Sequence, residues 1–367
     1  MFHKVISILF LLPTCFSFKI LPEKTVTLLN AADNSVLMPI VGAGTGGYSG
    51  SNSSFSFGQY PECFDGCYDA MCLQPNPVNF SLSSCGLYVN AAISIWLQIG
   101  GRRIDNSASY HNQLYVGQAV QAFLANKVNN VSRSDLFITS KVGPFLALGY
   151  NETIFQYQSI VKALGSNPDL ILIHWPSCST GGGCTSVDAE STDPPCMWNT
   201  STYNETLCRL STWKALLDIW KSGGTRAIGV SNYNETHLQE ILDANLPLPS
   251  VNQIPFHLYA SQVQANTIQF CQKNNILVNG YSPFGVPDRQ SFKPPFAPTE
   301  LLDPVVLQLA SKYNRTPGEI ILAWQNQLGI VVNPRSMNAI HMLNNLNYWD
   351  ITLTTDEINQ LNSRPQL

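Results

Sequence analysis

The sequence predicts an α/β protein with the (β/α)8 architecture of a TIM barrel, and three observations support this. Eight short apolar runs rich in β-branched residues recur along the chain, and stretches with helical spacing lie between most of them. The chain of 367 residues is long enough for one large barrel domain. Eight strands that alternate with helices describe a parallel sheet with helical crossovers, and a closed barrel accommodates that number.

The predicted barrel strands are residues 40–43, 103–105, 136–139, 170–174, 227–230, 251–254, 277–280 and 330–332. The clearest helices between them are residues 114–124, 213–220, 238–244 and 305–313. Ahead of the first strand, residues 26–29 and 36–38 flank residues 31–34, whose sequence Ala-Ala-Asp-Asn favours a turn. We therefore expect an N-terminal β-hairpin that caps the floor of the barrel.

Two stretches interrupt the alternation of strands and helices. Residues 46–85 are rich in Gly, Ser, Asn, Phe and Cys, and residues 177–208 have a similar composition. Each begins just after a predicted strand, which places both on the carboxyl face of a barrel, where active sites lie and loops grow without disturbing the core. We expect two loop inserts that form part of the rim of the site.

The cysteines indicate that both inserts are disulfide-rich. Each insert holds a cluster of four, namely Cys63, Cys67, Cys72 and Cys85 in the first and Cys178, Cys184, Cys196 and Cys208 in the second. Even clusters favour disulfides formed within each cluster. Zinc is the alternative, but the spacings lack the C-x2-C pairs of zinc ribbons, so we expect no metal site. The isolated Cys271 lies in an apparent helix and is expected to be buried.

The N-terminal segment is typical of a secretory signal peptide. Residues 1–17 combine a weakly positive start, a short apolar core at residues 5–12, and the small residues Cys15 and Ser17 where a signal peptidase would cut. A buried terminal strand or helix is the alternative. The apolar run is much shorter than the ~20 residues that a membrane span needs. We therefore expect a signal at residues 1–17, a barrel domain at residues 18–367, and a secreted protein or one in the secretory-pathway lumen.

Composition and sequons agree with that compartment. Charged residues make up 12% of the chain, against roughly 25% in average soluble proteins. Carbohydrate can hydrate a surface that charges do not. Eight N-x-S/T sequons are available for it, at Asn52, Asn79, Asn130, Asn151, Asn199, Asn204, Asn234 and Asn314. A net charge of −4 without a basic run argues against nucleic acid or an anionic membrane as partner and leaves small molecules. The oligomeric state is not determined by the sequence.

Four polar residues that follow predicted strands are expected to converge on one site. Asp105, Lys141 and His174 each lie at or just past the carboxyl end of a different strand, and Tyr110 follows soon after Asp105. Tyrosine is a poor acid, with an ordinary pKa of about 10, but the ammonium of Lys141, held by Asp105, would lower that value. His174 would donate to a substrate oxygen. Singly, each has a structural alternative: a packing tyrosine, an ion pair, or a strand end.

The segment from Gly100 to Asn112 resembles the aldo-keto reductase pattern G-[YF]-R-x-I-D-T-A-x-x-Y-x-N. The resemblance continues, in the family's order and spacing, through Thr-Ser-Lys at 139–141, Leu-Ile-His-Trp-Pro at 172–176, Ile-Gly-Val-Ser-Asn at 228–232, Val-Asn-Gln at 251–253 and Tyr-Ser-Pro-Phe-Gly at 281–285. It covers about residues 26–358 without the inserts.

The resemblance implies an NADPH-dependent oxidoreductase, with NADH as an alternative cofactor, that reduces a small-molecule aldehyde or ketone to an alcohol by hydride transfer. It implies that Tyr110 donates the proton and that Asp105, Lys141 and His174 complete the catalytic set, with Trp175 as a wall of the substrate pocket. The positions that match cofactor-binding residues of the family are Thr45, Ser231, Asn232, Gln253, Tyr281, Ser282, Phe284, Arg335, Ser336, His341 and Asn345. Capping of the following helix is the alternative role for Asn232.

The main departures from the family pattern fall in the region expected to bind the 2′-phosphate of NADPH. The pattern I-P-K-S-x4-R-I-x-E-N has Arg335 in place of lysine, His341 in place of arginine and Asn344 in place of glutamate. Arginine binds phosphate well, but histidine near neutral pH is only fractionally charged, which predicts a weaker clamp. Gly46 also replaces a common tryptophan, and Gln113 a common glutamate.

Two hypotheses follow. The first is the NAD(P)H-dependent reductase, which the four chemical groups favour. The second is a secreted, non-enzymatic binding or structural glycoprotein on the same scaffold, since fold does not guarantee function and the phosphate clamp is altered. Retention of Tyr110 and Lys141 favours the enzyme.

Overall fold

Eight parallel strands form one sheet that closes into a barrel, as predicted. The computed structural model describes residues 24–31, 35–46, 82–143, 148–177, 192–197, 200–285 and 299–364. In sheet order the strands are β3 (Gly42–Gly44), β4 (Arg103–Asp105), β5 (Phe137–Val142), β6 (Leu170–Ile173), β7 (Ala227–Ser231), β8 (Val251–Pro255), β9 (Leu277–Tyr281) and β10 (Val331–Asn333). A parallel bridge between Val41 and Val332 joins the two ends of the sheet.

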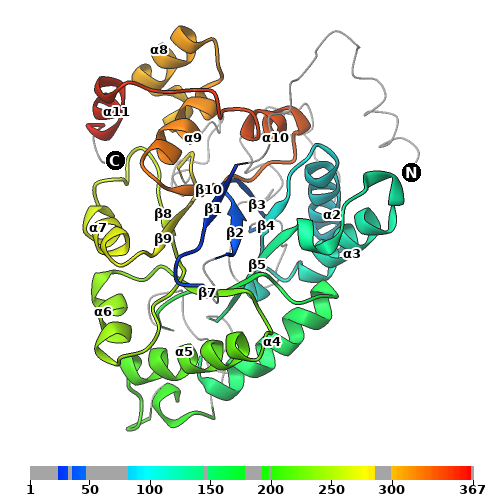
Figure 1. The fold of residues 1–367 in the computed structure, drawn as a ribbon, viewed down its shortest axis with the longest axis vertical. Coiled ribbons are helices and arrows are strands. Elements are labelled where there is room, and N and C mark those ends of the chain that lie inside the picture. The colour runs from blue at the N-terminus through cyan, green and yellow to red at the C-terminus, as the bar shows by residue number, and fades with distance from the viewer. Residues whose placement is uncertain are drawn as a thin grey trace.

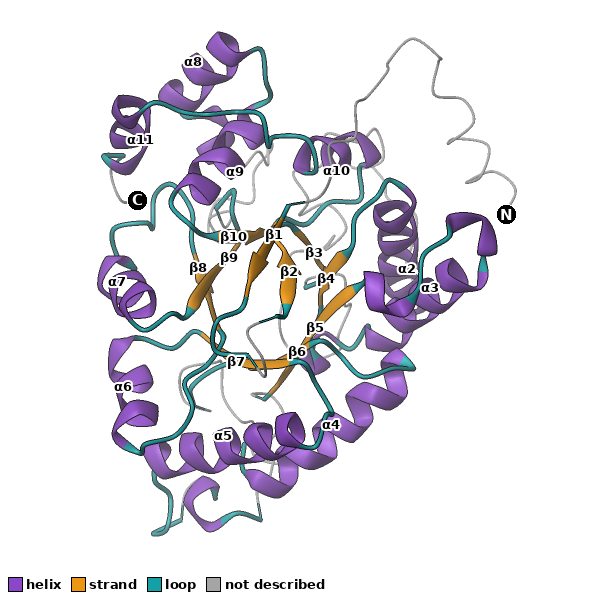
Figure 2. Ribbon diagram, in the orientation of Figure 1, coloured by secondary structure: helices purple, strands orange, loops and turns teal. Residues whose placement is uncertain are grey.

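Helices surround the barrel and follow its strands around the ring (Figures 1 and 2). They are α2 (Leu82–Gln98), α3 (Gln113–Ala125), α4 (Tyr150–Leu164), α5 (Glu205–Lys221), α6 (Glu235–Asp243), α7 (Ala265–Lys273), α8 (Pro304–Tyr313), α9 (Pro317–Gln327), α10 (Ala339–Asn345) and α11 (Thr355–Asn362). Side-chain oxygens of Asn204, Asn234, Asp303, Thr316, Asn338 and Thr354 cap helix N-termini. No helix in the described part of the chain is long and apolar enough to cross a membrane.

The predicted hairpin is confirmed. Strands β1 (Thr25–Thr27) and β2 (Leu37–Pro39) pair antiparallel and lie across the barrel in Figure 2. Leu28 and Met38, fully buried, pack with inward residues of the strands, such as Leu170 and Leu172. Burying each such side chain contributes about 1.5–3 kcal/mol to the stability of the fold. This packing attaches the hairpin to the barrel, where it closes the floor. A larger core fills the space between strands and helices.

Arg103 lies inside the barrel, which the sequence did not predict. Its guanidinium is fully buried and donates to the carbonyl oxygens of Pro39, at 2.7 Å, and Val332, at 3.0 Å, and also to the side chains of Asn279 and Asn333. Gly42 makes room for it, because a Cβ at that position would clash with the guanidinium. Arginine is thus accommodated through hydrogen bonds with neutral groups.

Several predicted boundaries are wrong. The first barrel strand is Gly42–Gly44 and not 40–43, because its pairing register with β4 runs from Gly42. Helix α2 begins at Leu82, inside the predicted first insert, and α5 begins at Glu205, so that Cys208 is helical and not part of a loop. Sequence composition identifies the cysteine-rich segments. It does not determine the residue at which helical hydrogen bonding begins.

The cysteine prediction is met in part. Within the described residues there is one disulfide, and it joins Cys196 to Cys208, two members of the second cluster. Cys271 is a fully buried free cysteine on α7, as expected. The signal segment, the sequons at Asn52, Asn79 and Asn199, the side chain of Cys85, and Cys63, Cys67, Cys72, Cys178 and Cys184 lie outside the described residues.

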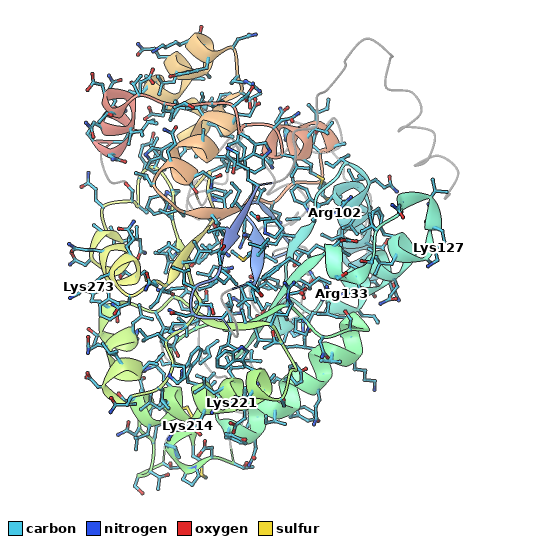
Figure 3. The ribbon with its side chains drawn as sticks, viewed as in Figure 1. Arg102, Lys127, Arg133, Lys214, Lys221 and Lys273 are labelled. Carbon is cyan, nitrogen blue, oxygen red and sulfur yellow. A yellow bond between two sulfur atoms is a disulfide. The ribbon has the colours of Figure 1, made fainter. Side chains whose placement is uncertain are left out.

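Cationic side chains are spread around the outside of the molecule. In Figure 3 the labelled cations lie on different sides of the barrel, with Arg102, Lys127 and Arg133 near α2 and α3, Lys214 and Lys221 on α5, and Lys273 on α7. Arg133 pairs with Asp169 at 2.8 Å, and Arg226 pairs with the same carboxylate at 3.2 Å. Some of these outer cations therefore serve local ion pairs, and the carboxylate that Arg133 and Arg226 share is buried.

Candidate active site

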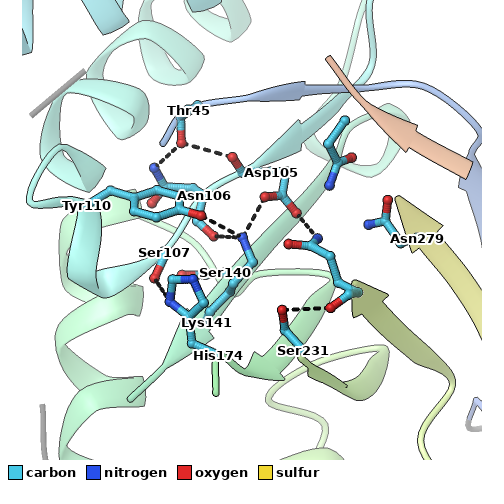
Figure 4. Close-up of polar contacts among 12 residues, drawn as sticks. Thr45, Asp105, Asn106, Ser107, Tyr110, Ser140, Lys141, His174, Ser231 and Asn279 are labelled. Carbon is cyan, nitrogen blue, oxygen red and sulfur yellow. Dashed lines mark hydrogen bonds and ion pairs between the residues drawn. The ribbon is translucent and has the colours of Figure 1, made fainter. Parts of the chain in front are cut away.

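The carboxyl ends of neighbouring strands bring the four predicted catalytic residues together (Figure 4). Asp105 is the last residue of β4, Lys141 lies near the end of β5, and His174 follows β6 directly. Tyr110 ends the short 3-10 turn η2 (Ala108–Tyr110), which follows β4. The Tyr110 and His174 rings meet edge to face, with centroids 5.5 Å apart. Parallel strands all point their carboxyl ends to one side, which explains the convergence.

Lys141 is the centre of this group. Its side chain is fully buried, and its Nζ donates to Asp105 Oδ1 at 2.5 Å, to the Asn106 carbonyl oxygen at 3.0 Å and to Tyr110 Oη at 3.4 Å. The other carboxylate oxygen of Asp105 accepts from Gln253 Nε2 at 2.7 Å. Burial favours a neutral lysine, but Asp105 and Tyr110 outweigh it and raise the pKa of Lys141 above its ordinary value. Lys141 is therefore an ammonium fixed beside the phenol.

The sequence predicts a pKa of Tyr110 below its ordinary value, but in the structure this pKa is raised. Desolvation by the surrounding barrel end raises this pKa, and the charge of Asp105 adds to the effect. The ammonium of Lys141 lowers it, as does the more distant guanidinium of Arg335, but not enough to offset the desolvation. The prediction counted the neighbouring charge and omitted the loss of water. Tyr110 is thus a protonated phenol, which is the form that a proton donor requires.

His174 is a neutral imidazole. Burial, and then the positive charge of Lys141, lower its pKa well below the ordinary value of 6.5. Its Nδ1 lies 2.9 Å from Ser107 Oγ and 3.0 Å from Ser109 Oγ. The sequence interpretation missed both serines. A signal was present, because Ser107 stands where the family pattern has alanine.

The residues predicted to contact a nicotinamide lie along the ends of β7, β8 and β9. Asn232 Nδ2 donates to the His174 carbonyl oxygen at 2.8 Å and to Ser231 Oγ at 3.1 Å, and Asn232 Oδ1 accepts from Tyr281 Oη at 2.8 Å. Ser231 Oγ donates to the Gln253 carbonyl oxygen at 2.9 Å. The capping alternative for Asn232 is wrong, because Asn234 caps α6. These side chains form one network that leads from the predicted cofactor-binding positions to His174.

Thr45 belongs to a second network on the other side of Tyr110. Its Oγ1 donates to the Asp105 carbonyl oxygen at 2.9 Å and accepts from Asn106 Nδ2 at 2.7 Å. Asn112 Nδ2 donates to the Thr45 carbonyl oxygen at 2.9 Å. Asn106 and Asn112 were not predicted as site residues, although Asn106 departs from the family's threonine. They connect the ends of β3 and β4 to the start of α3, whose N-cap residue is Asn112.

The predicted phosphate clamp follows β10. Arg335 and His341 are partly exposed, whereas Ser336 and Asn345 are buried. Ser336 Oγ accepts from the Asn338 amide at 3.0 Å, and Asn338 caps the short helix α10, on which His341 and Asn345 lie. A permanent cation, a hydroxyl and an imidazole follow β10 between residues 335 and 341, and these are groups that can bind a phosphate. Together with the amides of Asn232 and Gln253, this donor set fits a nicotinamide dinucleotide.

The remaining predicted positions lie around the same end of the barrel. Ser282 has the positive φ of 52° that ends β9, and Phe284 packs on α9, where a Cβ at Gly318 would contact its ring at 3.5 Å. Trp175 follows His174 and is half-buried. Gly46 lies against Tyr110, since a Cβ there would be 3.3 Å from the phenol oxygen. The part of the chain that the structure describes holds no group of three metal-ligating side chains.

Comparisons with known proteins find one family. Residues 87–364 match the model of the Aldo/keto reductase family. The chain is 32% identical over 284 residues to Aldo-keto reductase family 1 member A1 of Gallus gallus, which covers 75% of this chain and 80% of that protein. It is also 32% identical over 285 residues to the Homo sapiens protein of the same name, covering 75% and 81%.

Solved structures agree in fold. An aldo-keto reductase of the silkworm Bombyx mori complexed with NADPH is 27% identical, with a TM-score of 0.69, over 94% of this chain and 88% of that one. A second Bombyx mori aldo-keto reductase, in complex with NADP, is 25% identical with a TM-score of 0.69, over 93% and 92%. The two silkworm proteins were thus each crystallised with a nicotinamide cofactor.

Proposed function

Because the chain belongs to the aldo/keto reductase family, we propose that it is an NADPH-dependent reductase that converts an aldehyde or ketone to an alcohol and also accepts NADH. The observation that supports this most directly is the contact between a buried ammonium and a phenol: Lys141 Nζ lies 2.5 Å from Asp105 and 3.4 Å from Tyr110 Oη. An ion pair between Lys141 and Asp105 that served only the structure would not need the Tyr110 hydroxyl beside it. Proton donation to a substrate does need that hydroxyl.

The residues divide the chemical work. The reduced nicotinamide, when bound, supplies the hydride. Tyr110 gives its proton to the carbonyl oxygen, and Lys141 stabilises the phenolate that remains, while Asp105 holds the ammonium in place. His174 donates a hydrogen bond to the same oxygen as negative charge develops there. Trp175, half-buried beside His174, forms an apolar wall for the substrate.

The cofactor-binding residues form two groups in the proposal. Ser231, Asn232 and Gln253 bind the carboxamide, and the Tyr281 ring stacks on the nicotinamide. Arg335, Ser336 and His341 bind the 2′-phosphate at the far end. The other predicted cofactor-binding residues contact the part of the cofactor between its nicotinamide and its 2′-phosphate. They are Thr45, Ser282, Phe284 and Asn345. Asp105 and Ser231 already hold the side chain and the carbonyl oxygen of Gln253, which limits its movement before any ligand arrives.

Secretion and N-glycosylation remain part of the proposal. The sequon asparagines within the described residues are all exposed, namely Asn130, Asn151, Asn204, Asn234 and Asn314. Asn204 and Asn234 cap helices through Oδ1. A glycan is attached through Nδ2, so that the capping oxygen stays available. We expect glycosidase treatment of protein expressed in eukaryotic cells to lower its mass; an unchanged mass would contradict glycosylation.

The test of the function is cofactor binding followed by turnover. Tryptophan fluorescence during titration with NADPH and NADH, with Trp175 as the expected reporter, should show saturable binding. Oxidation of NADPH with a panel of small aldehydes and ketones should then show reduction. Tyr110→Phe should abolish reduction and leave cofactor affinity nearly unchanged, because the ring is kept and only the acidic hydroxyl is lost.

The outcomes separate the hypotheses. A Tyr110→Phe variant that retains most of its rate would mean that another group donates the proton. If purified glycoprotein binds neither cofactor, the non-enzymatic glycoprotein becomes the better account. The departures at His341 and Asn344 are the observation that keeps this alternative in the test.

A further inference from the structure

The turn that carries Tyr110 also holds the ring of His174. Ser107 caps η2 by accepting the Ser109 amide at 3.2 Å. The hydroxyl oxygens of the two serines lie 2.9 Å apart, and both lie within 3.0 Å of His174 Nδ1. Figure 4 shows Ser107 directed at the imidazole from the same turn as Tyr110. One short segment therefore positions two groups that face the substrate.

The backbone of His174 is fixed as well. Its amide donates to the Val142 carbonyl oxygen at 2.9 Å, and its carbonyl oxygen accepts from Asn232 Nδ2 at 2.8 Å. With the backbone and Nδ1 both held, rotation of the ring would break hydrogen bonds at a site that is only 8% exposed. The direction of the remaining ring nitrogen, Nε2, is set by these contacts.

The positions of the protons follow from counting donors and acceptors. A neutral imidazole has one N–H and one acceptor nitrogen. If Nδ1 is the acceptor, Ser107 can donate to Nδ1 while Ser109 donates to Ser107 Oγ, and every hydroxyl proton has a partner among these three side chains. If Nδ1 carries the proton, one serine hydroxyl must find an acceptor elsewhere. The first arrangement is the favourable one, because it leaves no hydroxyl proton of this cluster without an acceptor.

We propose that Ser107 and Ser109 are positioning residues that hold His174 in its Nε2–H tautomer, with this N–H directed at the substrate oxygen. The tautomer is inferred from the contacts of Nδ1 with the two serines, whereas its use rests on the proposed carbonyl reduction. His174 can then donate to the developing negative charge without first changing tautomer or rotating. The same turn supplies the second donor, Tyr110, so any shift of the turn moves both together.

The tautomer can be measured without any activity. In protein with ¹⁵N-labelled histidine, long-range ¹H–¹⁵N spectra distinguish a protonated from an unprotonated ring nitrogen, and His174→Asn identifies the signals. We expect an unprotonated Nδ1 and a protonated Nε2 in the wild type. In the double variant Ser107→Ala/Ser109→Ala, the Nδ1 signal should shift as it loses its donors. A protonated Nδ1 in the wild type, or unchanged spectra in the double variant, would overturn the proposal.

Kinetics test the consequence for catalysis. The double variant should lose on the order of ten- to a hundredfold in kcat, as expected for a misplaced donor, with cofactor affinity unchanged. The single variant Ser109→Thr keeps Ser107 and a hydroxyl at position 109. It should therefore retain most of the wild-type kcat. Ser250→Ala is the matched control: Ser250 is fully buried at the start of β8, and its hydroxyl has no hydrogen-bond partner among the described residues.

Two further results have distinct meanings. If the double variant keeps the wild-type kcat while its spectrum changes, the serines set the tautomer but do not position a group that matters, and the proposal fails. If the wild type reduces no carbonyl but shows the Nε2–H tautomer and its loss in the variant, the reductase proposal fails and the assignment of the tautomer stands. Thermal unfolding of each variant verifies that the fold is intact.

Discussion

At the scale of single residues, Arg335 and His341 are the basic side chains proposed to bind the 2′-phosphate of NADPH, and both are partly exposed. Arg335 carries a permanent charge, and His341 follows it in the first turn of α10, where the family pattern has arginine. A 2′-phosphate has nearly two negative charges and distinguishes NADPH from NADH. We therefore expect the side chain at position 341 to influence the choice between the two cofactors.

His341→Arg should strengthen NADPH binding, because a permanent guanidinium replaces an imidazole near the proposed 2′-phosphate site. The limit is one charge-assisted hydrogen bond, ~1.5–3 kcal/mol. Dissociation constants of both cofactors for the wild type and the variant provide the test, with NADH as the internal control because it lacks the phosphate. An unchanged ratio of NADPH to NADH affinity would show that the side chain at position 341 does not contact the phosphate.

At the scale of elements, the C-terminal helix α11 is attached to α8 through one carboxylate. Glu357 accepts from Lys312 Nζ at 2.6 Å, from Tyr313 Oη at 2.7 Å and from the Thr354 amide at 2.7 Å. Desolvation raises the pKa of Glu357, but these donors outweigh it and lower the pKa to about 2. The last contact belongs to the capping box of α11. The ionised carboxylate therefore stabilises both the helix and its packing.

Glu357→Gln should lower the free energy of unfolding at pH 7 by about 1–2 kcal/mol, because a cap and a charged hydrogen bond are weakened. A folded-state pKa below the unfolded one means that the stabilisation is present above pH ~4.5 and is lost as pH falls towards 2. The difference between wild type and variant should thus shrink in urea unfolding at pH 3. Asp356→Asn, which removes an exposed charge from the same turn, is the control, and an equal loss there would contradict the role of Glu357.

At the scale of the whole molecule, the C-terminal end of the second insert, residues 192–196, is bonded to helices α4 and α5 of the barrel. Thr192 donates its amide and its hydroxyl to Glu152 on α4, and Asp193 accepts from the Tyr150 amide and from Ser211 on α5. Cys196 adds a covalent link to α5 through Cys208. These contacts fix the end of an insert that follows His174 and Trp175, the residues expected to contact substrate.

We predict that all eight insert cysteines pair within their own clusters. With Cys196 joined to Cys208, Cys178 should pair with Cys184, and the first cluster should form two bridges of its own. Peptide mapping of the glycoprotein under non-reducing conditions identifies the linked peptides. A bridge from the first cluster to the second would contradict the prediction, although the expected common rim of the two inserts makes such a link geometrically feasible.

The sequence by itself determined the class of fold and the identity of the chemical groups. Apolar runs predicted the strands because burial on both faces of a parallel sheet demands them. Tyr110, Lys141 and His174 were identifiable because each follows a predicted strand and because the segments that contain them resemble the family's motifs in their order. These features are local, or they repeat along the chain. Both kinds of signal can be recognised from the order of residues without knowledge of the folded structure.

Only the tertiary structure decided features that depend on residues distant in sequence. The room that Gly42 makes for Arg103, the hold of Ser107 and Ser109 on His174, and the bond between Asn232 and the His174 carbonyl oxygen join different strands. The pKa of Tyr110 was mispredicted for the same reason. A neighbouring charge is visible in a motif, but the loss of water around a hydroxyl is produced by the whole barrel end and exists only once the chain has folded.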